Sequence, residues 1–150
     1  MIANTPNNLR PIYERPVLET PFYSSYKHLI QNDQYEEWAG YTTLASFAGE
    51  GQEYFSVRNT CGVYDMCPMI KYDISGPDAE RFMDHLVTRN ITKMLPERVT
   101  YTVWCDDNGH LIEDGTVFRL SPTKFRLCCA ERQCDWLADS AKYYDVTINN

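Results

Sequence analysis

The spacing of apolar and polar residues predicts strands and one clear helix in the second half of the chain. Apolar and polar positions alternate over residues 70–74, 98–105 and 111–120, which is the period of a strand with one buried face. Residues 75–88 carry apolar side chains at the three- and four-residue spacing of a helix, with Pro77 in the first turn and Ser75 and Asp78 suited to a capping box. We expect this helix to pack on a sheet.

The remaining segments complete a mixed fold. Residues 50–60 favour a short helix that stops at Gly62, and Asp107-Asn108-Gly109 is turn chemistry that joins two strands into a hairpin. Further along the chain the pattern predicts a strand, a helix and a last strand, over residues 124–130, 131–142 and 144–148. The expected fold class is α+β, with a mainly antiparallel sheet and helices packed on one side.

The N-terminal segment has a different character. Its prolines recur at five-residue intervals among several asparagines, at Pro6, Pro11, Pro16 and Pro21. This spacing favours extended chain over a repeat fold. We therefore expect an extended arm over residues 1–37, followed by one domain over residues 38–150.

Composition and charge narrow the functional classes. With 150 residues, of which 43% are hydrophobic and 23% charged, the chain has enough apolar material for one core. The net charge of −7 and the absence of a basic run argue against binding to nucleic acid or to an anionic membrane. No run of 18 apolar residues and no signal-peptide pattern stands in the sequence, so the cytoplasm is the default expectation. A small molecule or a protein is the expected partner.

The six cysteines form no CxxC pair, and no histidine stands at zinc-finger spacing from them. Cys128 and Cys129 would point to opposite faces of a strand and so could not easily share one ion. We expect reduced, mostly buried thiols and predict no metal site.

Two adjacent acids stand inside the strand over residues 111–120, where acids are normally disfavoured. Asp114 shares a face with Ile112 and Phe118, the more apolar face by count, so we expect it to be partly buried. A carboxylate there must be paired, hydrogen-bonded or used in chemistry, because an unpaired buried charge is costly. Glu113 points to the opposite face and is expected to be solvated or salt-bridged. The residues alone leave open whether Asp114 is catalytic or structural.

Four motifs in order give the chain a family resemblance. They are "EYFSVRNTCGVYDMCPM", "KYDISGPDAERFMDHLVTRNITKM", "VTYTVWCDDNGHLIEDGTVFRL" and "KFRLCCAERQCDWL". From about Trp38 to about Leu137 the chain resembles the N-terminal folate-binding region of the glycine cleavage T-protein (aminomethyltransferase) family. The matching positions are Arg58, Gly62, Tyr64, Asp65, Gly76, Asp78, Ala79 and the segment from Thr88 to Ile91.

The resemblance implies a T-protein-like folate-binding domain that takes part in one-carbon transfer, of an aminomethyl or methyl group, with tetrahydrofolate as cofactor. It makes Asp114 the catalytic residue, acting in proton transfer beside the folate nitrogens. It places Tyr101, Asp114, Cys128 and Ala130 at the folate. Cys128 and Ala130 stand where T-proteins have a Val and an Asn, so one polar contact to the pterin is missing.

Departures from the family pattern suggest alternatives. The family's Asp-Val-Ser-His-Met becomes Asp65 to Met69, and His110 replaces a glycine, which points towards folate-dependent demethylases of aryl methyl ethers, sulfonium or methylamine compounds. Family members are usually well over twice this length, and their later residues grip the pterin. We therefore expect an incomplete enzyme that uses a small-molecule one-carbon donor and whose partner is a missing C-terminal region or a second copy. A non-catalytic folate-binding or assembly module is the other alternative.

Overall fold

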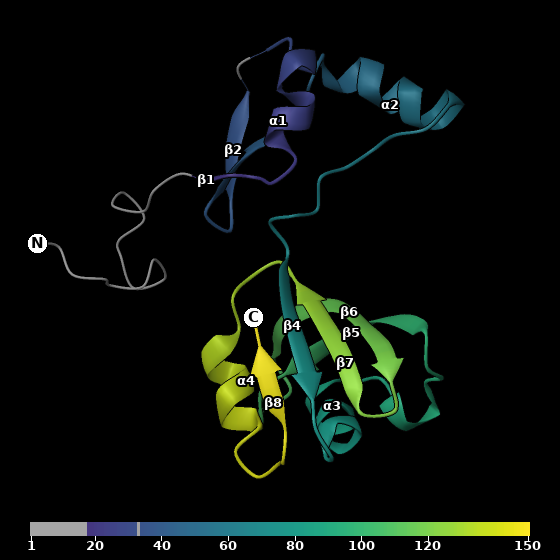
Figure 1. Ribbon diagram of the computed structural model, residues 1–150, viewed down its shortest axis with the longest axis vertical. Helices are drawn as coiled ribbons and strands as arrows, with labels where there is room; N and C mark the ends of the chain where they lie inside the picture. The colour runs from purple at the N-terminus through teal and green to yellow at the C-terminus, as the bar shows by residue number, and fades with distance from the viewer. Residues whose placement is uncertain (1–17, 33) are drawn as a thin grey trace, which may run out of the picture. The chain divides into compact units, whose positions relative to one another are not determined.

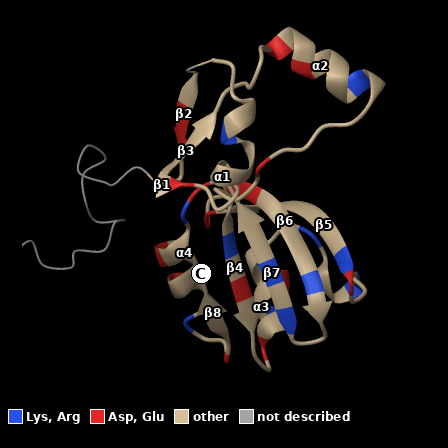
Figure 2. Ribbon diagram, turned by 45° about the horizontal axis from the view of Figure 1, so that its top comes forward, with Lys and Arg blue, Asp and Glu red and all other residues tan. Residues whose placement is uncertain are grey.

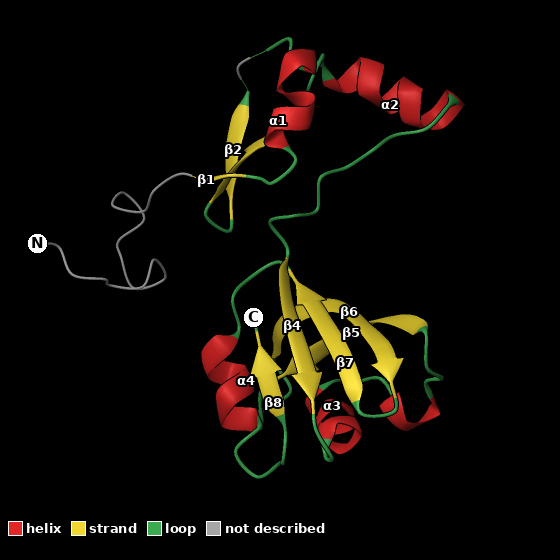
Figure 3. Ribbon diagram, viewed as in Figure 1, coloured by secondary structure: helices red, strands yellow, loops and turns green. Residues whose placement is uncertain are grey.

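The computed structural model describes residues 18–32 and 34–150. The chain divides into two compact units, Met1–Pro68 and Met69–Asn150. Each unit contains a sheet of its own, drawn in yellow in Figure 3.

The second unit is built on a five-stranded sheet with the strand order β5-β6-β7-β4-β8. All of its neighbouring strands pair antiparallel, as the alternating pattern predicted. The strands are β4 (Ile70–Ser75), β5 (Arg98–Cys105), β6 (Leu111–Ser121), β7 (Lys124–Cys129) and β8 (Thr147–Asn149). The Asp-Asn-Gly turn closes the predicted β5–β6 hairpin, since Gly109 has a positive φ of 81° and its N–H bonds to the carbonyl of Asp106.

Two helices pack on one face of this sheet (Figure 1). They are α3 (Ala79–Leu86) and α4 (Cys134–Ser140), and a short 3-10 turn, η4, spans Ile91–Lys93. Glu80 of α3 binds Arg119 on β6, and the backbone N–H of Gln133, just before α4, donates to Tyr72 on β4. Because Arg119 and Tyr72 both point to the same buried face, both helices cover that face. The predicted fold class is confirmed.

The start of α3 differs from the predicted capping box. Asp78 is the N-terminal cap residue, but its side chain makes no capping bond within the helix. Its carboxylate instead accepts hydrogen bonds from Arg81 and from the backbone N–H of Asp145. Asp78 therefore joins the helix start to the segment before β8.

The buried face of β6 is the opposite of the one predicted. Gly115, Val117 and Arg119 point towards the helices and are buried, whereas Asp114 is exposed on the other face. The prediction rested on a count of apolar side chains, which favoured the face that carries Asp114. The structure instead places Arg119 on the buried face, where a lone guanidinium would be costly. In the structure its charge is satisfied, since it donates to the carbonyls of Ile91 (3.3 Å) and Met94 (2.8 Å) and to the carboxylate of Glu80.

In its described residues the first unit holds a small three-stranded sheet and three helical segments. Its elements are β1 (Leu18–Glu19), α1 (Tyr23–Tyr26), the 3-10 turn η3 (Lys27–Leu29), β2 (Tyr35–Trp38), β3 (Tyr41–Leu44) and α2 (Glu50–Asn59). β3 pairs antiparallel with β2 and parallel with β1. The helix predicted over residues 50–60 is confirmed as α2.

The predicted arm over residues 1–37 differs from the structure in its described part. Residues 1–17 and 33 lie outside the described residues, but β1, α1, η3 and the start of β2 fall within residues 18–37. These elements are too short for a periodic pattern, and the strands among them form by pairing with β3. Within the part of the chain that the structure describes, no helix is both long and apolar enough to cross a membrane.

Candidate functional site

The face of the sheet turned away from α3 and α4 carries the residues predicted to bind the folate. The strand register places a row of four side chains across β5, β6, β7 and β4. In this row Tyr101 pairs with Thr116, Thr116 with Cys128, and Cys128 with Lys71. Paired residues point to the same side of a sheet, so this row lies on the open face. Asp114 stands two positions from Thr116 on β6 and therefore joins the same face.

Tyr101 and Asp114 are hydrogen-bonded to each other on this open face. The Tyr101 hydroxyl donates to Asp114 Oδ2 at 2.6 Å. The bond runs diagonally between β5 and β6, because the residue directly opposite Asp114 is Val103. The hydrogen bond to the Asp114 carboxylate, followed by partial desolvation, raises the pKa of Tyr101 above its usual value of 10.0. The two side chains form one exposed polar pair.

Cys128 and Ala130 lie beside this pair at the end of β7. Cys128 is buried, and burial raises the pKa of its thiol, so the thiol is uncharged at neutral pH. The last paired residues of β6 and β7 are Gly115 and Cys129, and Asp114 and Ala130 each stand one position beyond them. Strand register thus brings the four predicted site residues together at one end of the open face.

Gly115 allows β6 and β7 to approach each other closely beside the predicted site residues. A Cβ atom at residue 115 would collide with the carbonyl oxygen of Cys128 and would also meet the Trp104 ring at 3.4 Å. A side chain there would push β7 away from β6, so the glycine is required next to the site acid.

Glu113 has a place that the sequence did not predict. Its carboxylate is half-buried and accepts hydrogen bonds from the backbone N–H groups of Asp114 (3.0 Å) and Glu131 (3.2 Å). It therefore satisfies the donors that stand just beyond the end of the β6–β7 ladder. The sequence alone could not distinguish this role from that of a solvated side chain, because Glu113 is simply one of two adjacent acids.

The open face has a charged half and a mainly apolar half. Asp73 on β4 binds Arg126 on β7 through two hydrogen bonds, of 2.6 and 3.0 Å, and Lys124 lies 3.9 Å from the same carboxylate. Figure 2 shows the positive and negative positions along these strands. Towards β5 and β6 no described Lys or Arg stands on this face, and Val99 and Phe118, paired across the strands, add apolar side chains beside Tyr101 and Asp114. This half is suited to a flat, ring-shaped ligand.

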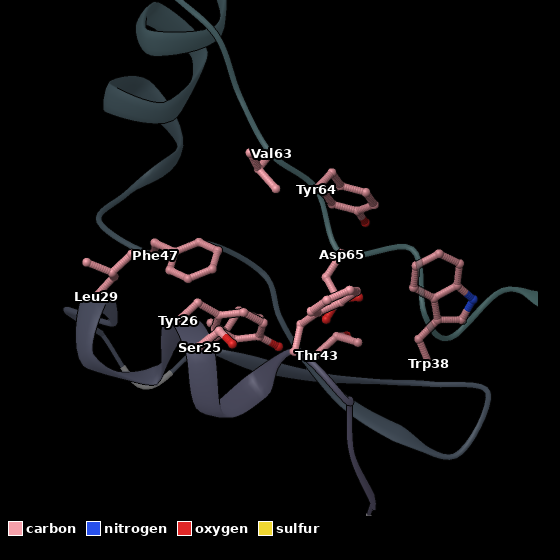
Figure 4. Close-up of a pocket in the computed structure, with 11 residues that line it drawn as sticks. Ser25, Tyr26, Leu29, Trp38, Thr43, Phe47, Val63, Tyr64 and Asp65 are labelled. Atoms are coloured by element: carbon pink, nitrogen blue, oxygen red, sulfur yellow. The ribbon is translucent and has the colours of Figure 1, made fainter.

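The first unit contains a separate pocket of about 520 Å³. Figure 4 shows its lining of aromatic rings around one carboxylate, that of Asp65. The Thr20 hydroxyl donates to Asp65 Oδ2 at 2.6 Å, and the Cys67 backbone N–H donates to Oδ1 at 3.0 Å. Burial acts to raise the pKa of Asp65, but hydrogen bonds from Thr20 and Cys67 together outweigh it and hold the pKa below its usual value of 3.8.

Comparison with known proteins identifies similar chains. The family model described as the GCVT N-terminal domain matches residues 23–150. An aminomethyltransferase of Lysinibacillus sphaericus is 29% identical over 118 residues, which are 76% of this chain and 32% of the relative. Aminomethyltransferases of Francisella philomiragia and Thermoanaerobacter pseudethanolicus are 27% and 29% identical over 136 residues, which are 88% of this chain and 37% and 36% of theirs.

A solved structure shares the fold. The crystal structure of the glycine cleavage system aminomethyltransferase T from Bartonella henselae matches with a TM-score of 0.79 at 17% identity, covering 89% of this chain and 38% of its own. The chain therefore spans about a third of the length of the proteins that it resembles.

Proposed function

Since the chain belongs to the GCVT N-terminal domain family, we propose that it is the N-terminal portion of a tetrahydrofolate-dependent aminomethyltransferase. Tetrahydrofolate binds on the open face of the sheet of residues 69–150, and Asp114 assists the proton transfer of the reaction. The one-carbon donor is a small molecule or a group presented by a partner. The matched relatives bear the name aminomethyltransferase, which favours an aminomethyl group over the methyl group of a demethylase.

One observation supports this proposal above the others, the hydrogen bond between Tyr101 and Asp114. An isolated acid on an open sheet face would be an ordinary solvated group. Here a tyrosine holds one oxygen of the carboxylate at 2.6 Å, which orients the side chain along the face. Among the described residues no donor binds the other oxygen, Oδ1, so it can accept a hydrogen bond from a ligand.

The residues on this face fit a pterin. A pterin is a flat ring system with hydrogen-bonding edges, and such ligands prefer apolar surfaces with a few oriented polar groups. The Tyr101 ring and Val103 provide apolar surface, and Asp114 provides an acceptor for an N–H edge. Ala130 provides only a methyl group, so the pterin edge beside it has no side-chain hydrogen bond from this residue.

The chemistry requires proton movement at nitrogen. When bound, tetrahydrofolate supplies the amine nitrogen that accepts the one-carbon unit, and a proton must leave or reach that centre as the bond forms. Asp114 Oδ1 can take up such a proton, while Tyr101 keeps Oδ2 in place.

Calorimetry with tetrahydrofolate tests the proposal on the chain as it stands. Because the chain spans only about a third of the length of the aminomethyltransferases that it matches, we expect weak binding, in the high micromolar range or poorer, on the order of −5 kcal/mol. Asp114→Asn and Tyr101→Phe should both weaken it, whereas Asp107→Asn, which neutralises an exposed acid in the β5–β6 turn, should not. The absence of heat at millimolar ligand in a folded sample would contradict the proposal.

A further inference from the structure

Asp65 in the aromatic pocket carries a negative charge that no cation balances among the described residues. The groups that hydrogen-bond to its carboxylate come from Thr20, Cys67 and Tyr26, and all of them are neutral. The ion pairs found in the described part of the chain are formed by other acids. A half-buried carboxylate is only partly screened by water, so its field acts on whatever occupies the pocket.

The rings around Asp65 favour the same kind of occupant. Trp38 and Tyr64 form one pair, with ring centroids 6.5 Å apart, and Tyr26 and Phe47 form a second, edge-to-face pair at 5.3 Å. Figure 4 shows Asp65 between these two pairs. Aromatic faces carry negative electrostatic potential and attract cations, most strongly when the cation is poorly hydrated.

The size and the remaining lining define the cation further. A volume of about 520 Å³ lies within the range typical of small-molecule sites. The other apolar residues of the lining are Phe22, Leu29, Leu44 and Val63. Such walls cannot replace the hydration shell of a primary ammonium, whereas an alkylated ammonium brings apolar methyl groups that they can contact.

We propose that this pocket of the first unit binds a small alkylated ammonium cation, with Asp65 as the counter-charge and with Trp38 and Tyr64 as aromatic walls. The described residues that line the pocket fall within residues 22–65 of the first unit, whereas Tyr101 and Asp114 belong to the second unit. The site is also independent of the proposed function, because it involves neither folate nor Asp114.

The test compares choline with 3,3-dimethylbutan-1-ol, in which a neutral carbon replaces the charged nitrogen of choline. Nuclear magnetic resonance on the chain should show saturable shifts of the Trp38 indole N–H and of the Tyr64 ring protons on adding choline. Because the two molecules have nearly the same shape, the ratio of their dissociation constants measures the contribution of the charge. We expect choline to bind about tenfold more tightly than the alcohol at low salt, with the difference shrinking as salt is added.

Variants assign the effect to individual groups. Asp65→Asn keeps the size of the side chain and should reduce choline binding to the level of the neutral alcohol. Tyr64→Leu removes an exposed ring that makes no hydrogen bond among the described contacts, so it should weaken choline binding several-fold without unfolding the chain. Tyr143→Leu is the matched control, since Tyr143 is also largely exposed but is not among the residues that line the pocket, and it should leave choline binding unchanged.

Three results would overturn the proposal. These are equal or tighter binding of the alcohol compared with choline, choline shifts that map outside the pocket lining, and undiminished choline binding by Tyr64→Leu. If Asp65→Asn fails to fold, the proposal is still tested by the salt dependence of the affinity difference between choline and the alcohol, and by choline binding to Tyr64→Leu. Equal or tighter binding of the neutral alcohol, the first of these results, would show that the pocket is a plain apolar surface.

Discussion

The carboxylate of Glu113 accepts a hydrogen bond of 3.2 Å from the backbone N–H of Glu131, and so joins β6 to the loop between β7 and α4. Its other oxygen binds the N–H of Asp114 at 3.0 Å. The two adjacent acids therefore have different tasks. Asp114 faces the open side of the sheet, and Glu113 holds the backbone on which Asp114 and Ala130 stand.

Replacing Glu113 should affect the site through its backbone. Glu113→Ala leaves two N–H donors without a protein partner and should lower the free energy of unfolding by about 1–2 kcal/mol, and speed amide hydrogen exchange at residues 114 and 131. Glu113→Gln keeps one acceptor oxygen and should cost about half as much. Glu131→Gln removes a charge but keeps the N–H, so it serves as the control. Unchanged exchange at both amides in Glu113→Ala would refute the bridging role.

Asp114→Asn tests the catalytic assignment. In an enzyme of full family length that contains this domain, the change should lower turnover by roughly a hundredfold or more, the usual scale for an acid-base group. Because Asp114 is exposed, the melting temperature should stay nearly constant. Single-turnover rates and melting curves on the same protein separate the two effects. A stable variant with parental turnover would exclude Asp114 from catalysis.

The Tyr101–Asp114 pair should be visible in a tyrosine titration. Since the hydrogen bond to the Asp114 carboxylate raises the pKa of Tyr101, Asp114→Asn should shift that pKa back towards its usual value. The raised pKa favours the folded state below the pKa of an unfolded tyrosine, and this contribution is lost as the pH rises through the folded value. Ring-carbon resonances of Tyr101 followed between neutral and alkaline pH provide the measurement. An identical midpoint in both proteins would mean that the bond is absent in solution.

Two arginine–carboxylate pairs of the second unit should differ in strength. The Arg119 side chain is nearly buried, binds the partly exposed Glu80 and also donates to two carbonyls, so Arg119→Met should destabilise the chain by about 2–4 kcal/mol. The Arg126 side chain is exposed and binds the half-buried Asp73, so Arg126→Met should cost about 1 kcal/mol or less. Urea unfolding compares the two variants directly. Equal losses in the free energy of unfolding would show that the hydrogen bonds from Arg119 to α3 and to the η4 segment contribute little to stability.

The first unit should self-associate when the chain is studied alone. Helix α2 has no buried residue, and it exposes Tyr54, Phe55 and Val57. Apolar surface of this extent usually finds a partner, either further chain of the same enzyme or a second copy. Sedimentation velocity over a range of concentrations should show a rising average mass. A single monomeric species at high concentration would contradict this expectation.

The sequence alone determined the elements of the second unit and the chemistry of its acid-bearing hairpin. Alternation predicted β4, β5, β6 and β7, helical spacing predicted α3, and the Asp-Asn-Gly turn predicted the hairpin. These features follow from local geometry, because side-chain period and turn conformation depend on residues close together in the chain. The family resemblance then gave Tyr101, Asp114, Cys128 and Ala130 as the predicted folate-binding residues.

Only the tertiary structure decided which face of the sheet is open. Arg119 lies on the buried face because Glu80 and two backbone carbonyls, from segments 25 to 39 residues away, satisfy its charge. The same holds for Glu113, whose second partner is 18 residues further along, and for Asp65, whose hydroxyl donor is 45 residues earlier. The cost of placing a charge depends on such distant partners, and periodicity along the chain does not contain them.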